Sequence, residues 1–184
     1  MNFLEGYYNI TPLIPCIQLL GNGVKGVEVG VQRAESLCTV LQNCSNIEKM
    51  YAVDNWQPYT ESLGENTFFI NQQDSELAKL IALHNIKWSG FENKVTIVEK
   101  NSLEAVEQFD NEYFDLIFLD SYGNELECMK ELSAWYPKLR HGGLFCGHDS
   151  SYDKVKYTVE IFRDNNNIDS PLSIFADTWC WKKQ

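Results

Sequence analysis

The stretch GVEVGVQRAES, residues 26–36, combines a short valine-rich run, a glycine and the first turn of a helical pattern. Valine-rich runs favour strands, and a glycine directly after such a run allows the backbone to pass close to a ligand. From Ala34 to Leu41 the apolar residues Leu37, Val40 and Leu41 recur at helical spacing. The stretch therefore predicts a buried strand that leads through a tight turn into a helix.

Outside this unit, further short apolar runs alternate with helical patterns. The runs cover residues 50–53, 94–98, 114–119 and 143–146, and the helical patterns cover 77–84, 127–139 and 152–163. Such alternation predicts an α/β, Rossmann-like doubly wound sheet that is mostly parallel. Residues 172–175 and 178–182 read as two strands with only two residues between them, a connection that only antiparallel strands can make. We therefore expect one antiparallel strand near the C-terminus.

The pattern contains no linker and no internal repeat. We expect one domain over residues 1–184, with an N-terminal helical segment at 1–25 and a core at 26–184. In the helix predicted around 77–84, the apolar face holds Leu77, Leu80, Ile81 and His84. The N-terminal apolar stretch, residues 10–20, contains two prolines and lacks a basic flank, so it fits neither a signal peptide nor a membrane span.

Composition narrows the classes of partner. The chain has 184 residues, 44% of them hydrophobic, and 15 basic against 26 acidic residues, which gives a net charge of −11. An acidic surface argues against nucleic acid and against anionic membranes, and favours a small-molecule acceptor. The six cysteines form no C-x-x-C pair and no zinc pattern. We interpret them as reduced structural residues of a cytoplasmic protein.

Acidic residues follow several of the predicted strands. In an open α/β sheet, ligands bind beyond the carboxyl ends of the strands, at the point where the strand order reverses. The first strand carries Glu28, the second and fourth end at Asp54 and Asp120, and the fifth leads into His148 and Asp149. We expect these residues to lie along one edge of the sheet.

Individually, these residues allow two interpretations. Asp54 stands 24 residues after Gly30, where an acid binds a ribose diol, but an Asp before Asn also caps a turn. Trp56 suits either an adenine wall or simple packing, and Ser102 suits either an adenine contact or a helix N-cap. Asp120 directly follows the apolar run 116–119, where burial of an acid is expensive and indicates a function.

Taken in order, these motifs resemble class I S-adenosylmethionine-dependent methyltransferases, in particular a small bacterial and phage-type group with Gly-His-Asp after the fifth strand. The resemblance runs from about residue 26 to residue 153 and rests on GVEVGV at 26–31, YAVDNW at 51–56, Asn101-Ser102, FDLIFLD at 114–120 and GHD at 147–149. It implies an S-adenosylmethionine site. The implied cofactor contacts are Glu28, Gly30, Val31, Arg33, Ser36, Asp54, Asn55, Trp56, Asn101, Ser102, Asp120 and Tyr122.

The chain departs from the family pattern after the fourth strand. Many relatives place a histidine where Gly123 stands, so the resemblance leaves His148 as the candidate base, with Asp120 and Asp149 to orient it. A related subgroup binds a divalent ion at the positions of Asp120 and Asp149, although Ser150 replaces the third ligand here. The expected reaction is O-methylation of a small molecule, with Mg²⁺ as a second candidate cofactor.

Two other functions remain open at this stage. One is a non-catalytic relative that binds the adenosyl cofactor as an interaction module, which the loss of the histidine at Gly123 would favour. The other is an NAD(P)-dependent oxidoreductase, although the chain lacks G-x-G-x-x-G. Trp179 and Trp181 are the candidate contact of a homo-oligomer. The segment 57–74, with Tyr59, is a candidate cover for the cofactor or the acceptor.

Overall fold

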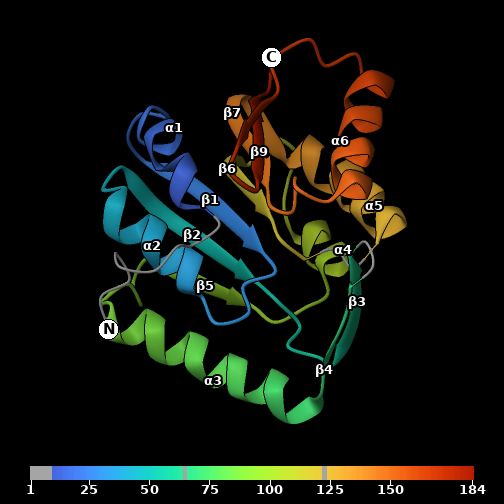
Figure 1. Cartoon of the computed structure of the whole chain (residues 1–184). Coiled ribbons are helices and arrows are strands. Elements are labelled where there is room, and N and C mark those ends of the chain that lie inside the picture. The colour runs from blue at the N-terminus through green and yellow to red at the C-terminus, as the bar shows by residue number, and fades with distance from the viewer. Residues whose placement is uncertain (1–9, 64–65, 122–123) are drawn as a thin grey trace.

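A single seven-stranded sheet forms the centre of the molecule (Figure 1). The computed structural model describes residues 10–63, 66–121 and 124–184. The strands are β1 Val24–Val29, β2 Ile47–Val53, β5 Val95–Val98, β6 Phe114–Leu119, β7 Leu139–Gly147, β8 Ser173–Phe175 and β9 Thr178–Lys182. They lie in the order β5-β2-β1-β6-β7-β9-β8. The first five are parallel, and β9 pairs antiparallel with both β7 and β8, which confirms the predicted sheet.

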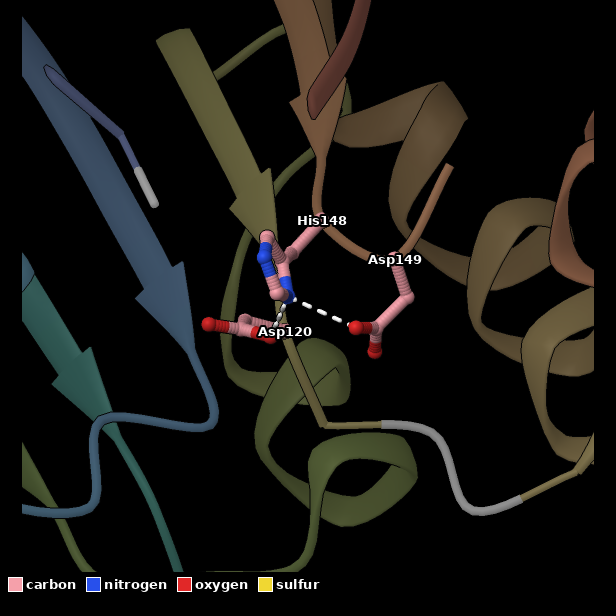
Figure 2. Close-up of side chains that lie close together, drawn as sticks. All are labelled: Asp120, His148 and Asp149. Atoms are coloured by element: carbon pink, nitrogen blue, oxygen red, sulfur yellow. Dashed lines mark ion pairs between the residues drawn. The ribbon is translucent and has the colours of Figure 1, made fainter. Parts of the chain in front are cut away.

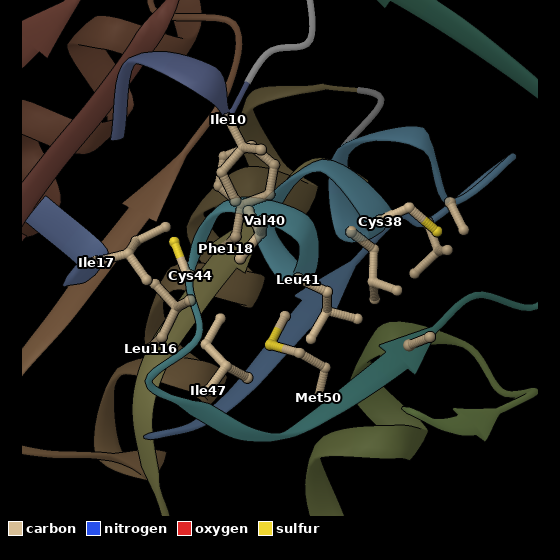
Figure 3. Close-up of a cluster of buried hydrophobic side chains, with 14 of the residues drawn as sticks. Ile10, Ile17, Cys38, Val40, Leu41, Cys44, Ile47, Met50, Leu116 and Phe118 are labelled. Carbon is tan, nitrogen blue, oxygen red and sulfur yellow. The ribbon is translucent and has the colours of Figure 1, made fainter. Parts of the chain in front are cut away.

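Helices cover both faces of the sheet. One face carries η1 Thr11–Leu13, α1 Ile14–Gln18, α2 Glu35–Asn43 and α3 Gln72–Trp88. The other carries α4 Ser102–Ala105, η2 Val106–Gln108, α5 Glu125–Trp135, η3 Tyr136–Lys138 and α6 Asp153–Asn165. The residues of β1 and β6 alternate between the two cores, as expected for strands buried on both faces. Figure 3 shows the first core, where Met50 and Ile47 of β2 pack among side chains of α1, α2 and β6.

The orientation of α3 differs from the sequence prediction. The residues that face the sheet are Ser75, Ala78, Ala82, Asn85 and Ile86, whereas of the predicted apolar face Leu77, Leu80 and His84 are exposed and Ile81 is half-buried. Leu77 and Leu80 are 52% and 64% exposed. Two contacts fix this rotation: the Asn85 side chain donates to the carbonyl of Arg33 at 2.9 Å, and Lys79 pairs with Glu99. The spacing of the apolar residues alone therefore predicted the wrong buried face for α3.

The C-terminal hairpin also corrects an expectation. Trp179 and Trp181 on β9 are 1% and 2% exposed, stacked with ring centroids 5.1 Å apart. Trp181 also lies beneath the guanidinium of Arg163 of α6. Both tryptophans belong to the second core, so they are not available for a contact between subunits.

The segment 57–74 forms a feature that the sequence pattern did not show. It contains an antiparallel hairpin, β3 Tyr59–Leu63 and β4 Asn66–Ile70, that is separate from the main sheet. Figure 1 shows this hairpin beyond the ends toward which β1 and β2 point. The hairpin therefore stands on the side of the sheet where the candidate site was predicted.

Two smaller predictions concern the cysteines and the membrane. All six cysteines are free, and five of them are buried. Within residues 10–63, 66–121 and 124–184, no helix is long and apolar enough to cross a membrane.

Candidate active site

The strand register brings the predicted acids to one edge of the sheet. Val29 pairs with Val53 on one side and with Leu119 on the other, and Leu119 pairs with Gly147. The residues that follow these strands therefore start side by side at the carboxyl edge of the sheet. The strand order reverses between β1 and β6, which is where an open α/β sheet binds its ligand.

The loop after β1 is tightly constrained. Gly30 has φ +89°, and a Cβ at this position would overlap the backbone of Asp120. Glycine is thus required because two loops of the site approach each other here. Gln32 and Ala34 also have left-handed backbone, with φ of 47° and 59°. Ala34 therefore adopts a conformation that is strained for a side-chain-bearing residue.

Glu28 is fully buried at the end of β1. Ser36 at the start of α2 donates a short hydrogen bond to its Oε1, while Oε2 has no hydrogen-bond partner. Burial raises the pKa of Glu28 to about 8, against the lowering effect of Ser36, and Asp120 and Asp54 raise it further. A buried carboxyl oxygen without a donor is costly in the protein alone, and suits a site that receives a cationic ligand group.

Asp54 organises the loop after β2. Its Oδ2 accepts from the backbone N–H of Gln32 at 2.8 Å, and its Oδ1 accepts from that of Trp56 at 2.7 Å. Burial raises its pKa, although these backbone hydrogen bonds lower it. The turn-capping interpretation is therefore present in the structure. The backbone N–H groups of Val31 and Asn55 also lower its pKa by hydrogen bonding, so a ribose diol would share the carboxylate with these backbone donors.

Trp56 has a packing role. It is 5% exposed, and its indole N–H donates to the carbonyl of Gln32 at 2.8 Å, which ties the loops after β1 and β2 together. Among the other predicted contacts, Val31 is buried, Arg33 is exposed, and Asn55 accepts from the N–H of Gln57 at 3.1 Å. Tyr122 and Gly123 lie outside the described residues.

At the third loop, Asn101 and not Ser102 is the N-cap, because Asn101 Oδ1 accepts from the N–H of Leu103 at 3.0 Å. Ser102 is buried and accepts from the indole N–H of Trp135 at 2.9 Å. It also bonds to the buried carboxyl of Glu131, which accepts from Ser121 at 2.8 Å. Burial raises the pKa of Glu131 to about 7. Glu131 was not among the predicted site residues, although its place between the apolar residues of α5 was a signal of burial.

His148 is surrounded by carboxylates (Figure 2). Its Nδ1 lies 2.8 Å from Asp149 Oδ1 and 3.3 Å from Asp120 Oδ1, the two pairs drawn in Figure 2. Its Nε2 lies 3.3 Å from Asp177 Oδ2. Burial lowers the pKa of His148, but Asp120 and Asp149 outweigh that effect and raise it to about 10. At neutral pH the ring is therefore a cation within three carboxylates.

Asp177 was not predicted. It lies in the two-residue turn between β8 and β9, and β8 runs in the direction of the parallel strands, so its end reaches the same edge. Asp177 Oδ1 also accepts from the N–H of Ser151 at 2.6 Å. The predicted C-terminal hairpin could have indicated Asp177. If the first strand of that hairpin runs in the direction of the parallel strands, its turn lies at their carboxyl ends.

The cluster has the composition of a cation site. One ligand atom each from Asp120, His148 and Asp149 lie within 4.8 Å of one another. Asp149 is 7% exposed and has left-handed backbone, with φ 62°. Strain of this kind in a non-glycine residue is concentrated at functional sites. The two acids that the resemblance implied as metal ligands, Asp120 and Asp149, therefore lie together, with His148 Nδ1 close to both.

A separate hollow of about 470 Å³ lies beside β5, the strand at one end of the sheet. It is lined by residues of β2 and β5, by Gln108, and by the aromatic residues Phe109 and Tyr113. The hydroxyls of Tyr51 and Tyr113 are 2.7 Å apart at its wall. None of the predicted site residues lines this hollow, so it is distinct from the cluster at the carboxyl edge.

Comparison with known proteins identifies the family of the chain. Residues 27–150, two thirds of the chain, match the family described as methyltransferase domain. No curated protein matches the chain. Among solved structures, precorrin 8w decarboxylase from Methanobacterium thermoautotrophicum has 16% identity and a TM-score of 0.65, over 94% of this chain and 88% of the other.

Two other solved structures differ in the substrates that their names indicate. The O-methyltransferase NovP has 17% identity and a TM-score of 0.60, over 93% of this chain and 79% of the other. A protein proposed to be an rRNA methylase, from Clostridium thermocellum, has 9% identity and a TM-score of 0.69, over 98% and 100%. At these identities the neighbours establish the fold. Together with the family match, they show that the chain belongs to the methyltransferase-domain family and is a class I S-adenosylmethionine-dependent methyltransferase.

Proposed function

We propose that the enzyme transfers a methyl group to a hydroxyl of a small molecule. The observation that carries this proposal is the cluster of Asp120, His148, Asp149 and Asp177, which stands beside the loop of Gly30. A hydroxyl acceptor must lose its proton during transfer, and this cluster offers groups that hold protons or a cation.

Glu28 and Asp54 are the proposed cofactor ligands. S-adenosylmethionine supplies a methyl group already activated on a sulfonium, so the protein mainly has to bind and align it. The unpartnered Oε2 of Glu28 suits the cofactor's cationic methionine end, and the carboxylate of Asp54 suits a ribose diol. Gln32 and Trp56 hold Asp54 in place through its two backbone hydrogen bonds.

His148 is the proposed proton acceptor. Asp120 and Asp149 hold its Nδ1 and fix the ring, so that Nε2 faces Asp177. With a pKa of about 10, only a small fraction of His148 is deprotonated at neutral pH. A turnover that relies on His148 alone therefore rises with pH up to about 10.

A divalent cation is the second proposed component. Asp120 and Asp149 are the residues that would hold it. Two carboxylates suit Mg²⁺ or Mn²⁺. Such an ion lowers the pKa of a bound hydroxyl. It also neutralises the carboxylates that keep His148 protonated, so we expect the pH profile of turnover to move to lower pH when the ion is present.

Site charge supports a small acceptor. Three carboxylates surround the reacting edge, and a phosphate backbone is repelled by such a surface. Phe175 and Asp177 at the end of the C-terminal hairpin, together with the β3–β4 hairpin, are the proposed boundaries of the acceptor site. The rRNA assignment of one structural neighbour makes RNA the natural competing acceptor in a test.

The test measures methyl transfer from labelled S-adenosylmethionine. Catechols, sugars and other hydroxylated metabolites are compared with ribosomal RNA, with and without Mg²⁺ or Mn²⁺. We expect label in a hydroxylated small molecule, a loss of at least about 100-fold in turnover in His148→Ala, and nearly unchanged cofactor affinity. The matched control is His141→Ala, since the His141 side chain is 67% exposed and remote from the cluster.

Three results would contradict the proposal. Label in RNA alone would show that the acceptor class is wrong. Cofactor binding without turnover on the whole panel would favour the non-catalytic interpretation. Loss of cofactor affinity in His148→Ala equal to the loss of turnover would give His148 a structural role.

A further inference from the structure

The large apolar side chains of α3 lie on its solvent side. Leu77, Leu80, Leu83 and Trp88 are 52%, 64%, 42% and 60% exposed, while the sheet side of the helix carries mostly small residues. A surface helix of a globular protein normally has the opposite arrangement. Figure 1 shows α3 along the outside of the molecule, and none of the helices and strands that the structure describes covers its outer face. An exposed apolar stripe of this kind marks an interaction surface.

The charges on this face follow a self-complementary pattern. Glu76, Leu80, Leu83 and Lys87 are separated by steps of four, three and four residues, so they form one stripe along the helix. In an antiparallel pair of such helices, residues whose numbers add up to the same total lie opposite each other. Glu76 then meets Lys87 of the second copy, and Leu80 meets Leu83 of the second copy.

We propose that α3 is the interface of a homodimer, in which two copies of α3 pack antiparallel about a two-fold axis. A two-fold interface uses the same patch on both subunits, so the patch must complement itself. The stripe meets that condition, with an acid at one end, a base at the other and leucines between. A partner of a different sequence would not require this symmetry.

Net charge also favours α3 as the meeting surface. The chain carries −11 overall, so most pairs of surfaces on two copies repel each other. α3 contains two acidic and two basic residues and is therefore neutral. Lys79 is already paired with Glu99 within the chain, so Lys87 is the base that the stripe presents. This interface takes the place of the one expected at Trp179 and Trp181 of β9, because both tryptophans are buried within the subunit.

The first experiment is sedimentation velocity of the full chain over about 1–200 μM, a range that suits a modest interface. The variant Leu80→Arg is compared with Leu126→Arg, because both leucines are 64% exposed and lie on different helices. We expect a dimer for the wild type and for Leu126→Arg, and a dissociation constant at least about tenfold higher for Leu80→Arg. Far-UV circular dichroism checks that each variant folds.

The second experiment tests the antiparallel register. Glu76→Lys places two lysines opposite each other at both symmetric contacts, and Lys87→Glu does the same with two glutamates. Each single variant is expected to weaken the dimer several-fold, and the double variant, which restores opposite charges, is expected to recover it. A wild type that stays monomeric, a dimer that survives Leu80→Arg, or a double variant no tighter than the singles would overturn the proposal.

Discussion

Replacing Glu28 with glutamine is expected to stabilise the protein, and to do so only at higher pH. The variant keeps the size of the side chain and an acceptor for Ser36, but removes a buried carboxyl group. Burial, opposed by the hydrogen bond from Ser36, raises the pKa of Glu28 from 4.5 to about 8. Between these values the folded state holds a proton that the unfolded chain has released, so the wild type loses stability as pH rises from 4.5 through 8.

The size of the effect follows from the same values. The interval from 4.5 to about 8, at about 1.36 kcal/mol per pH unit, corresponds to roughly 5 kcal/mol when Glu28 is fully ionised in the fold. Relaxation around the charge reduces this figure, so we expect Glu28→Gln to gain about 2–5 kcal/mol over the wild type at pH 9. Near pH 4.5 the two proteins should have similar stability.

The assay is urea unfolding followed by tryptophan fluorescence, at about pH 5, 7 and 9. The control is Glu160→Gln, an exposed glutamate of α6, for which the difference from the wild type should be small at every pH. A difference between wild type and Glu28→Gln that is the same at pH 5 and pH 9 would refute the reasoning. So would a variant that becomes relatively less stable at pH 9.

Three further predictions concern the site. Gly30→Ala should destabilise the fold by about 2 kcal/mol or more in urea unfolding, since φ is +89° and the new Cβ overlaps Asp120; an unchanged midpoint would contradict this. Ser121→Ala should cost about 1–3 kcal/mol, because buried Glu131 loses a donor, and wild-type stability would show that water replaces it. The pKa of His148 is raised from 6.5 to about 10, so its stabilising contribution is complete below pH 6.5 and is lost as pH rises through 10. His148→Gln should therefore be less stable than the wild type at pH 6 and nearly equal above pH 10, measured with a chelator present; a constant difference would contradict this ion-pair account.

Much of the fold could be predicted because strand and helix periodicity are local properties. The run 114–119 coincides with β6, and the C-terminal hairpin gave the antiparallel strand correctly. The face of α3 could not be predicted in this way, since its rotation depends on Asn85 reaching the carbonyl of Arg33. That contact joins residues far apart in the sequence, and it outweighs hydrophobic spacing.

The candidate site shows the same division. Parallel strands that end level with each other brought the residues after β1, β2, β6 and β7 together, as expected from topology alone. The residue pattern left Trp56 open between an adenine wall and packing, and it placed the cap of α4 at Ser102 instead of Asn101. Asp177 and Glu131 escaped notice because their roles depend on where a turn and a helix face lie in space.

The most direct test of the account is calorimetric titration of S-adenosylmethionine and S-adenosylhomocysteine into the wild type and Asp54→Ala, with NAD⁺ as the control ligand. The account predicts one site per chain with micromolar affinity for both adenosyl ligands, no binding of NAD⁺, and at least about 100-fold weaker binding in a folded Asp54→Ala. Equal affinity in the wild type and Asp54→Ala, or no binding of either adenosyl ligand, would contradict the assignment of the cofactor site to the carboxyl edge of this sheet.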